Sequence, residues 1–366
     1  MTNKKKTDKK ELTRLERVRA EMARHGLTQL IVSDPLAIFY LTGVHINPGE
    51  RMYCLLLSAD GAARVFLNRL FGTPDFGLPV TGFDDVDDAP ALLAPYLDKT
   101  RALGIDKDWP ARFLLRLQEL PVAREFRVGS ICVDATRAVK DEDEQARMRQ
   151  SSIVNDECMS EISTHIAAGK TENQLADELA AIYAAHGCTG MSFPPIVGFG
   201  DDAADPHHEN SDRELQPGEP VLIDMGGVYR GYCSDMTRVF FTAEPTAEQR
   251  KIYELVRLAN ESAIALIKPG VKICELDAAA RRVITDAGYG PYFNHRLGHF
   301  IGLQDHEYGD VSAANTWEAK PGMCFSIEPG IYLPGNFGVR IEDLVLVTED
   351  GCEVLNHYPK TVQVLE

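Results

Sequence analysis

Apolar positions in the first third of the chain switch between helical spacing and the continuous runs typical of buried strands. Residues 11–27 carry apolar side chains three and four positions apart and end near Gly26, which predicts an amphipathic helix. Residues 29–34 form a short apolar run that stops at Pro35, which predicts a strand. Because strands, turns and helices continue to alternate as far as residue 137, we expect an α/β N-terminal domain over residues 11–137.

A second domain is expected to begin just before a long amphipathic segment at residues 140–166. This segment opens on charged residues and then places apolar side chains at helical spacing, which predicts a helix. The residues expected to point inward are Met148, Ile153 or Ser152, Val154, Met159 and Ile162. We therefore assign residues 138–366 to the second domain, and the lysine-rich residues 1–10 to a flexible basic tail.

The second domain carries an internal repeat. Residues 169–187 can be aligned with residues 270–288, with glycine at both ends of each segment and a leucine at the same place inside. The polar residues that align further along are His207 with His306, Asp224 with Glu328, and Asp235 with Glu342. Chance alignment of common glycine and leucine positions is the alternative, but it would not also align the acids. We therefore expect a pseudo-twofold duplication, in which each half contains two helices and then an antiparallel hairpin.

Each half contains one pair of carboxylates on its predicted hairpin. Asp224 and Asp235 form the first pair, Glu328 and Glu342 the second, and a Pro-Gly begins seven residues before the first acid of each. Residues equidistant from a hairpin turn face each other, so we expect each pair to lie opposite, around residues 229–230 and around Gly335. Like charges placed opposite each other destabilise a sheet, whereas bound cations remove the repulsion.

Four acids with His299 between the pairs predict a site for two divalent cations. An isolated acid near a turn is usually solvated, and a lone histidine is usually a hydrogen-bonded polar residue. The prediction therefore rests on the occurrence of all four acids together with His299. Carboxylates can bridge two ions about 3.5–4 Å apart. We expect Asp235 and Glu342 to bridge, Asp224 to bind one ion, and His299 with Glu328 to bind the other. Oxygen-rich ligation favours Mn²⁺, with Co²⁺ or Zn²⁺ as alternatives.

Other polar residues near these motifs are candidates for catalysis or substrate binding. His207, His295 and His306 are candidates because neutral imidazole can move a proton or stabilise an oxyanion. The alignment with His306 favours His207 over His208, which is expected at the surface. Arg340 lies two residues before Glu342 and either orients that carboxylate or forms an ordinary cross-strand ion pair.

At these motifs the sequence resembles the pita-bread metallopeptidases, which include methionine aminopeptidase, Xaa-Pro aminopeptidase and Xaa-Pro dipeptidase (prolidase). The matching segments are PHHENSDRELQPGEPVLIDMGGVYRGYCSDMTRVF, HRLGHFIGLQDHE and KPGMCFSIEPGIYLPGNFGVRIED. The resemblance implies an α+β pita-bread catalytic domain over residues 138–366 and a creatinase-like N-terminal domain over residues 11–137, which methionine aminopeptidases lack. It also implies a homodimer.

The resemblance assigns roles to individual residues. The metal ligands it implies are Asp224, Asp235, His299, Glu328 and Glu342. It implies catalytic or intermediate-stabilising roles for His207 and His306, and Glu328 is also a plausible proton carrier. His295 carries over as a substrate contact, and we group Arg340 with it as substrate-binding.

The function expected from these features is hydrolysis of the Xaa-Pro bond at the N-terminus of dipeptides or short peptides by a hydroxide that bridges two metal ions. Xaa-Pro dipeptidase is favoured, and Xaa-Pro aminopeptidase is the second choice. A metallohydrolase that acts on a non-peptide amide or amidine, and a non-catalytic peptide-binding module, are the alternatives.

Two departures from the family pattern bear on specificity. Phe300 stands where many members have glycine after the ligand histidine, so we expect it to change the wall of the pocket. The loop at residues 308–320 contains no arginine, whereas some prolidases use one there to bind the carboxylate of the dipeptide.

Composition excludes several classes of protein. The net charge of −17 argues against nucleic acid or an anionic membrane as a partner, and we find no apolar stretch long enough to span a bilayer. The eight cysteines are scattered without a CxxC motif, which is typical of reduced thiols. With a charged N-terminus that does not resemble a secretory signal, these features predict a cytoplasmic protein.

Overall fold

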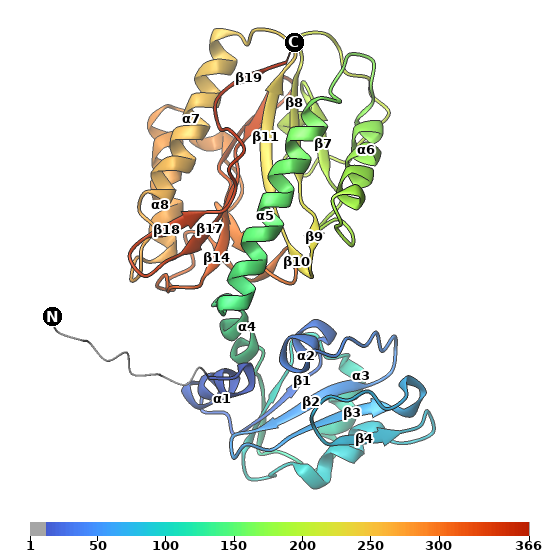
Figure 1. Cartoon of the computed structure of the whole chain (residues 1–366). Coiled ribbons are helices and arrows are strands. Elements are labelled where there is room, and N and C mark those ends of the chain that lie inside the picture. Colours follow the sequence, from blue (N-terminus) through green and yellow to red (C-terminus); the bar gives the residue numbers. More distant parts are fainter. Residues whose placement is uncertain (1–11, 366) are drawn as a thin grey trace, which may run out of the picture. The chain divides into compact units, whose positions relative to one another are not determined.

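The computed structural model describes residues 12–365, so the tail predicted at residues 1–10 lies outside the described residues. The chain divides into two compact units between Arg137 and Ala138. Figure 1 shows a sheet with helices in the first unit, and a second unit in which longer helices flank the strands.

The N-terminal unit contains a six-stranded mixed sheet in the order β4-β3-β2-β1-β5-β6. All four residues of the central strand β1 are buried, and β1 pairs antiparallel with β2 and parallel with β5. The elements are α1 (Arg14–Arg24), β1 (Gln29–Val32), α2 (Pro35–Thr42), β2 (Tyr53–Ser58), β3 (Ala63–Asn68), β4 (Val80–Phe83), β5 (Ala102–Ile105), α3 (Ala111–Gln118), β6 (Glu125–Val128) and α4 (Ile131–Ala138).

Local signals explain where the first helices begin. Thr13 and Glu16 form a capping box at the start of α1, and the Asp34 side chain accepts hydrogen bonds from the first turn of α2, which starts at Pro35. The α/β architecture predicted for this part of the chain is confirmed.

The C-terminal unit places four long helices around two main sheets. Helices α7 and α8 lie side by side at one edge of the unit, α6 lies at the opposite edge, and α5 runs between them in the view of Figure 1. The sheet orders are β19-β11-β8-β7 and β13-β12-β14-β17-β18, and β9–β10 and β15–β16 form two short hairpins. The elements are α5 (Glu142–Ser163), α6 (Glu172–Ala185), β7 (Ile196–Phe199), β8 (Pro220–Met225), β9 (Val228–Tyr229), β10 (Tyr232–Cys233), β11 (Met236–Phe241), α7 (Ala247–Ile264), α8 (Ile273–Asp286), β12 (Gly298–Phe300), β13 (Glu307–Val311), β14 (Cys324–Ile327), β15 (Gly330–Leu333), β16 (Phe337–Arg340), β17 (Asp343–Val347), β18 (Cys352–Val354) and β19 (Gln363–Val364).

Helix α5 is the helix predicted at residues 140–166, and it begins at a capping box formed by Asp141 and Glu144. Its buried face is more polar than predicted. Ile153, one of the two alternatives for the inward position, is 50% exposed, whereas Ser152 is fully buried. A helix turns about 100° per residue, and Ser152 lies four positions after the buried Met148, on the same face.

The two halves of the C-terminal unit contain the same succession of elements. The first half runs through α5, α6, β7, β8 and β11, and the second through α7, α8, β12, β14 and β17. In each half the last three strands are antiparallel neighbours. This order is consistent with the internal duplication predicted from the sequence.

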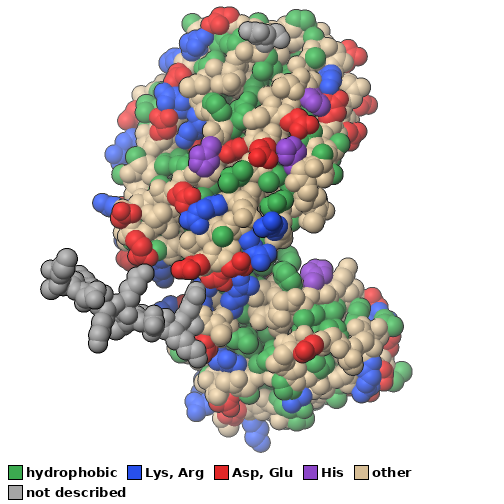
Figure 2. Space-filling view, viewed as in Figure 1, with side chains coloured by type: hydrophobic (Ala, Val, Ile, Leu, Met, Phe, Trp, Pro, Cys, Tyr) green, Lys and Arg blue, Asp and Glu red, His purple; other side chains and the backbone are tan. Residues whose placement is uncertain are grey.

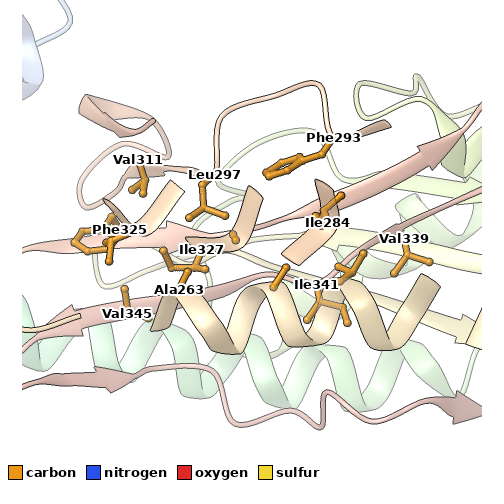
Figure 3. Packing of buried hydrophobic residues seen from close by; sticks show 14 of the residues in the cluster. Ala263, Ile284, Phe293, Leu297, Val311, Phe325, Ile327, Val339, Ile341 and Val345 are labelled. Atoms are coloured by element: carbon orange, nitrogen blue, oxygen red, sulfur yellow. The ribbon is translucent and has the colours of Figure 1, made fainter. Parts of the chain in front are cut away.

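The main hydrophobic core of this unit lies between α7, α8 and the strands that carry the second carboxylate pair. Ala263 of α7, Ile284 of α8 and Ile327 of β14 are fully buried and belong to this core (Figure 3). Burial of each large apolar side chain contributes about 1.5–3 kcal/mol. The core therefore fixes β14 and β17, the strands that flank Glu328 and Glu342 in the sequence.

Acidic, basic and hydrophobic side chains are intermixed over the face seen in Figure 2. Within residues 12–365, no helix combines the length and the hydrophobicity needed to cross a membrane. All eight cysteines are free, and Cys233 and Cys324 are buried in one apolar cluster.

Candidate metal centre

One cavity of about 470 Å³ in the C-terminal unit gathers the side chains that the sequence singles out. The predicted site residues that line it are Asp224, Asp235, His299, Glu328, Glu342, His207, His295, His306 and Arg340. His208, Arg296 and Asp305 also line it, and Phe193, Pro194, Ile196 and Pro206 form an apolar part of its wall. Residues that are far apart in the sequence therefore converge on one space.

The first carboxylate pair lies on a hairpin whose register differs from the predicted one. The predicted turn centre is one residue too early, because β9 and β10 pair around Arg230 and Gly231. These residues have φ values of 50° and 83°, and a two-residue turn of the type common in hairpins requires positive φ at both positions. Asp224 therefore lies opposite Thr237 and not Asp235. Asp235 precedes Thr237 by two residues, so the alternation of an extended chain still brings it to the same side.

The second carboxylate pair follows the predicted register. Strands β14 and β17, and then β15 and β16, pair around one centre at Gly335, whose φ is 71°. Glu328 and Glu342 are equidistant from this centre, and both side chains reach the cavity.

His299 connects the two pairs from β12. Its Nε2 lies 3.3 Å from Asp235 Oδ2 and 3.7 Å from Glu328 Oε1. Burial, followed by the neighbouring His306, lowers the pKa of His299 to about 3, so the ring is neutral. Its Nδ1 lies 3.3 Å from the carbonyl oxygen of Phe300, and a proton shared there leaves Nε2 with a lone pair that points toward the acids.

Arg340 combines the two roles considered for it, because it forms an ion pair and also helps to orient Glu342. It is 2% exposed, and its Nη2 donates to Asp224 Oδ2 at 2.6 Å, which is an ion pair between strands of two different sheets, β16 and β8. Its Nε donates to Thr237 Oγ1 at 3.0 Å, and Thr237 in turn donates to Glu342 Oε2 at 2.7 Å. The third contact is from Nη1 to the Tyr332 hydroxyl at 2.9 Å. Arg340 therefore orients acids from both pairs, and these contacts engage the end of its side chain with protein groups.

The three predicted histidines occupy different environments in the cavity. The His306 ring lies 4.0 Å from the His299 ring, centroid to centroid, and its side chain is 61% exposed. His295 Nε2 lies 2.9 Å from the Tyr332 hydroxyl, and burial is the main reason that its pKa is lowered to about 4. His207 is exposed at the mouth.

His208 was expected at the surface, but the structure directs it to the cavity wall. Its Nε2 lies 2.8 Å from Glu172 Oε2, and the Glu172 side chain is fully buried. The same carboxylate accepts hydrogen bonds from the backbone N–H groups of Phe199 and Ser211, both at 3.0 Å. A carboxylate held in this way fixes the orientation of the His208 ring. The adjacent pair of histidines was visible in the sequence, but the distant Glu172 was not recognisable as its partner.

Asp305 is a fifth acid in the cavity that the sequence reading did not select. One possible ligand atom of Asp305 lies within 4.8 Å of such atoms of His299 and His306, so the three residues could hold a metal ion together. The Oδ1 of Asp305 has no hydrogen-bond partner among the described residues. Burial, followed by the charge of Asp224, raises the pKa of Asp305 to about 7. Its position directly before His306 was the signal available in the sequence.

Phe300 does not change the wall of the cavity. The side chain is fully buried on the other side of the strand from His299, where its ring packs against Trp317 and Phe325 with centroids 5.9 and 5.3 Å away. Neighbouring side chains on a strand point to opposite faces, so the residue after the candidate ligand enters the core.

Comparison with known proteins identifies the family. Residues 146–349 match the model of metallopeptidase family M24, and residues 14–139 match the creatinase/prolidase N-terminal domain. The chain belongs to metallopeptidase family M24. This M24 peptidase is 37% identical over 360 residues to an uncharacterized peptidase of Staphylococcus aureus, with 95% of this chain and 100% of the relative covered. It resembles the solved dipeptidase PepE of Mycobacterium ulcerans (TM-score 0.90, 34% identity, 96% of each chain) and the prolidase of Pyrococcus furiosus (TM-score 0.82, 30% identity, 93% and 99% of the chains). These neighbours confirm the pita-bread fold.

Membership of an M24 metallopeptidase family implies divalent metal ions, and the residues in this cavity fit them. Ligand atoms of Asp235, His299 and Glu342 lie within 4.8 Å of one another. Asp224, Asp235 and Glu342 each keep one buried oxygen that no group of residues 12–365 hydrogen-bonds. Burial and the neighbouring carboxylates raise the pKa values of Asp235 and Glu342 well above their usual range, and the pKa of Glu328 is raised to about 8, mainly by burial. Buried, unpartnered anions are costly, and bound cations offset that cost.

Proposed function

We propose that this M24 peptidase hydrolyses the Xaa-Pro bond of dipeptides, and that short N-terminal Xaa-Pro peptides are its second class of substrate. The observation that carries the proposal is the set of buried carboxylates with unpartnered oxygens around His299 in one cavity. The apolar wall that includes Phe193, Pro194 and Ile196 suits a pyrrolidine ring. The prolidase among the structural neighbours supports proline as the residue after the cleaved bond.

Two divalent ions would be held by the acids of both hairpins together with His299. We propose that Asp224, Asp235, His299, Glu328 and Glu342 would hold these ions. When bound, such ions activate water near neutral pH and polarise the scissile carbonyl. The predominance of oxygen ligands favours Mn²⁺, with Co²⁺ or Zn²⁺ as alternatives.

The remaining residues of the cavity supply proton transfer and orientation. Glu328 reaches the cavity from the second hairpin, and we propose that it carries a proton from the attacking water toward the leaving nitrogen. His306 lies beside His299 and is suited to donate to the oxyanion, and His207 at the mouth is suited to assist departure of the proline nitrogen. Arg340 keeps Asp224 in place through their 2.6 Å ion pair.

A substrate series tests this proposal directly. Metal-reconstituted protein is assayed with Met-Pro, Met-Leu, Met-Pro-Gly and a longer Met-Pro peptide, and chelated protein serves as the blank. We expect cleavage of Met-Pro with added Mn²⁺, little cleavage of Met-Leu, and no cleavage after chelation. Hydrolysis of a small non-peptide amide without cleavage of any Met-Pro substrate would overturn the proposal.

We also propose a homodimer, as the resemblance to pita-bread peptidases implies. Light scattering on the purified protein gives the molar mass in solution. A mass of one chain at micromolar concentration would contradict this part of the proposal.

A further inference from the structure

Arg296 is an exposed cation in the wall of the cavity, and its side chain has no partner among the described residues. It lies three residues before His299 in the sequence and lines the same cavity as the five candidate ligands. Its guanidinium makes no hydrogen bond or ion pair with any residue in the described range 12–365. Arg340, the other arginine of this cavity, is buried and hydrogen-bonded to three side chains. Arg296 is therefore the arginine of this cavity that remains available for a ligand.

The backbone on both sides of Arg296 is held firmly. The carbonyl oxygen of His295 accepts a hydrogen bond from Arg281 at 2.9 Å. On the other side, the Leu297 N–H donates to Val311 at 2.8 Å, and the Leu297 carbonyl accepts from Glu328 N–H at 2.8 Å. The Cα of Arg296 is thus fixed relative to Glu328, and only the flexible side chain can adjust to a bound molecule.

The charge of Arg296 acts inside the cavity. Burial is the main reason that the pKa of His306 is lowered, and the positive charge of Arg296 is the second. Arg296, His306 and Glu328 line one cavity of about 470 Å³, so the cation faces the space that an anionic part of a small substrate would occupy.

Arg296 also lines a second cavity, of about 480 Å³, whose other wall includes Tyr308, Asn315 and Trp317. In a dipeptide, the free carboxylate is separated from the scissile nitrogen by a single carbon. In a longer peptide, an uncharged amide replaces this carboxylate, and the chain must continue past it. A residue placed between the two cavities can therefore distinguish the two classes of substrate.

We propose that Arg296 binds the free C-terminal carboxylate of the dipeptide and thereby makes this peptidase a dipeptidase. The proposal rests on the proposed function, and it goes further by naming the residue that sets the length of the substrate. A guanidinium can donate two parallel hydrogen bonds to a carboxylate, an interaction that an amide cannot reproduce.

The test compares Met-Pro with its C-terminal amide. For the wild-type protein, we expect kcat/KM to be at least about tenfold higher for Met-Pro than for the amide. Arg296→Ala should lower kcat/KM for Met-Pro by about 10- to 100-fold, mainly through KM, and change the value for the amide by no more than about twofold. Arg296→Lys should recover part of the loss, because lysine keeps the charge but not the paired donors. Arg282→Ala, at an exposed position on α8, is the matched control and should behave like wild type.

Two results would overturn the proposal. An equal loss for Met-Pro and the amide would mean that Arg296 supports the structure and does not read the carboxylate, and no loss for either would mean that it is an ordinary surface residue. If the wild-type protein does not cleave Met-Pro, the proposed function fails separately, and the acid and amide of Met-Leu are compared instead. If neither dipeptide is cleaved, calorimetric titration of Met-Pro and its amide into wild type and Arg296→Ala gives the same comparison, and equal affinities for both compounds in both proteins would reject the role of Arg296.

Discussion

Two neighbouring acids at the start of β17, Glu342 and Asp343, are both buried but have opposite electrostatic environments. Asp343 is fully buried, and it accepts hydrogen bonds from Arg238 Nη2 at 2.8 Å and from Lys360 Nζ at 2.7 Å. Burial alone would raise the pKa of Asp343, but these two cations outweigh it, and the pKa is lowered. Glu342 is 1% exposed, keeps one unpartnered oxygen among the described residues, and has a pKa raised well above its usual range by burial and neighbouring acids.

The difference shows what distinguishes a candidate metal ligand from a structural acid. Both side chains lose their hydration on folding, so burial does not separate them. The protein supplies positive charge to Asp343 from its own side chains, whereas it surrounds Glu342 mainly with further carboxylates. Neighbouring residues on a strand point to opposite faces, which allows one strand to hold a completed ion pair on one side and a site that lacks a cation on the other.

The strongest challenge to this comparison is removal of a candidate ligand. Glu342→Ala and Asp235→Ala should each lower turnover of Met-Pro by more than about 100-fold and reduce the bound metal, because both acids offer ligand atoms to the candidate metal site. Metal content is measured by mass spectrometry on the same samples used for the assay. Glu349→Ala, at an exposed position after β17, is the control. Full activity of either variant after metal stripping would contradict the assignment.

Neutralising Asp343 should lower the stability of the protein, whereas neutralising Glu342 should not. Asp343→Asn leaves Arg238, which is 1% exposed, next to an uncharged group, and should lower the free energy of unfolding by about 3–5 kcal/mol. Glu342→Gln removes a buried negative charge and should leave the metal-depleted protein as stable as wild type, or more stable. Urea denaturation of both variants without metal measures these changes. Equal destabilisation by the two substitutions would contradict the proposed difference between the environments of Asp343 and Glu342.

The stability of the metal-depleted protein should also depend on pH in a way that tests this comparison. The pKa of Glu328 rises from 4.5 to about 8 on folding, mainly because of burial, so the folded protein binds a proton more tightly than the unfolded chain. Its contribution to stability is present below pH 4.5 and is lost as the pH rises through about 8, and Asp235 and Glu342 act in the same direction.

The thermal midpoint of the metal-depleted protein should therefore fall between pH 5 and pH 8, and saturating Mn²⁺ should remove most of that decrease. The measurement is a thermal scan at each pH, with and without the ion. A midpoint that rises over this range without metal would show that these acids are not destabilised by burial.

The smallest expected effect concerns the histidine that Glu172 orients. His208→Ala should lower kcat for Met-Pro by about tenfold, because the ring lines the cavity in a fixed orientation. His186→Ala is the control, since that histidine is partly exposed, contacts Glu157 and Glu161, and does not line the cavity. Glu172→Gln should reproduce the loss and change the pH profile. Wild-type kinetics in both His208→Ala and Glu172→Gln would assign this pair to the structure alone.

Much of the architecture was predictable because its signals are local. Alternating strands and helices predicted the α/β N-terminal unit, and a capping box marked the start of α5. The spacing of the second hairpin around Gly335 gave the register that places Glu328 opposite Glu342. The first hairpin was misjudged by one residue, because the turn is chosen by which residues tolerate positive φ, here Arg230 and Gly231.

The sequence by itself determined which chemical groups this protein brings to its cavity and the family to which it belongs, because residue type and short-range spacing are properties of the chain. The tertiary structure alone decided which acids acquire cationic partners. Arg238 reaches Asp343 from 105 positions away, and Arg340 reaches Asp224 from 116 positions away. Such pairings depend on how sheets and helices pack, and packing also left Arg296 beside the candidate metal ligands with no partner among residues 12–365.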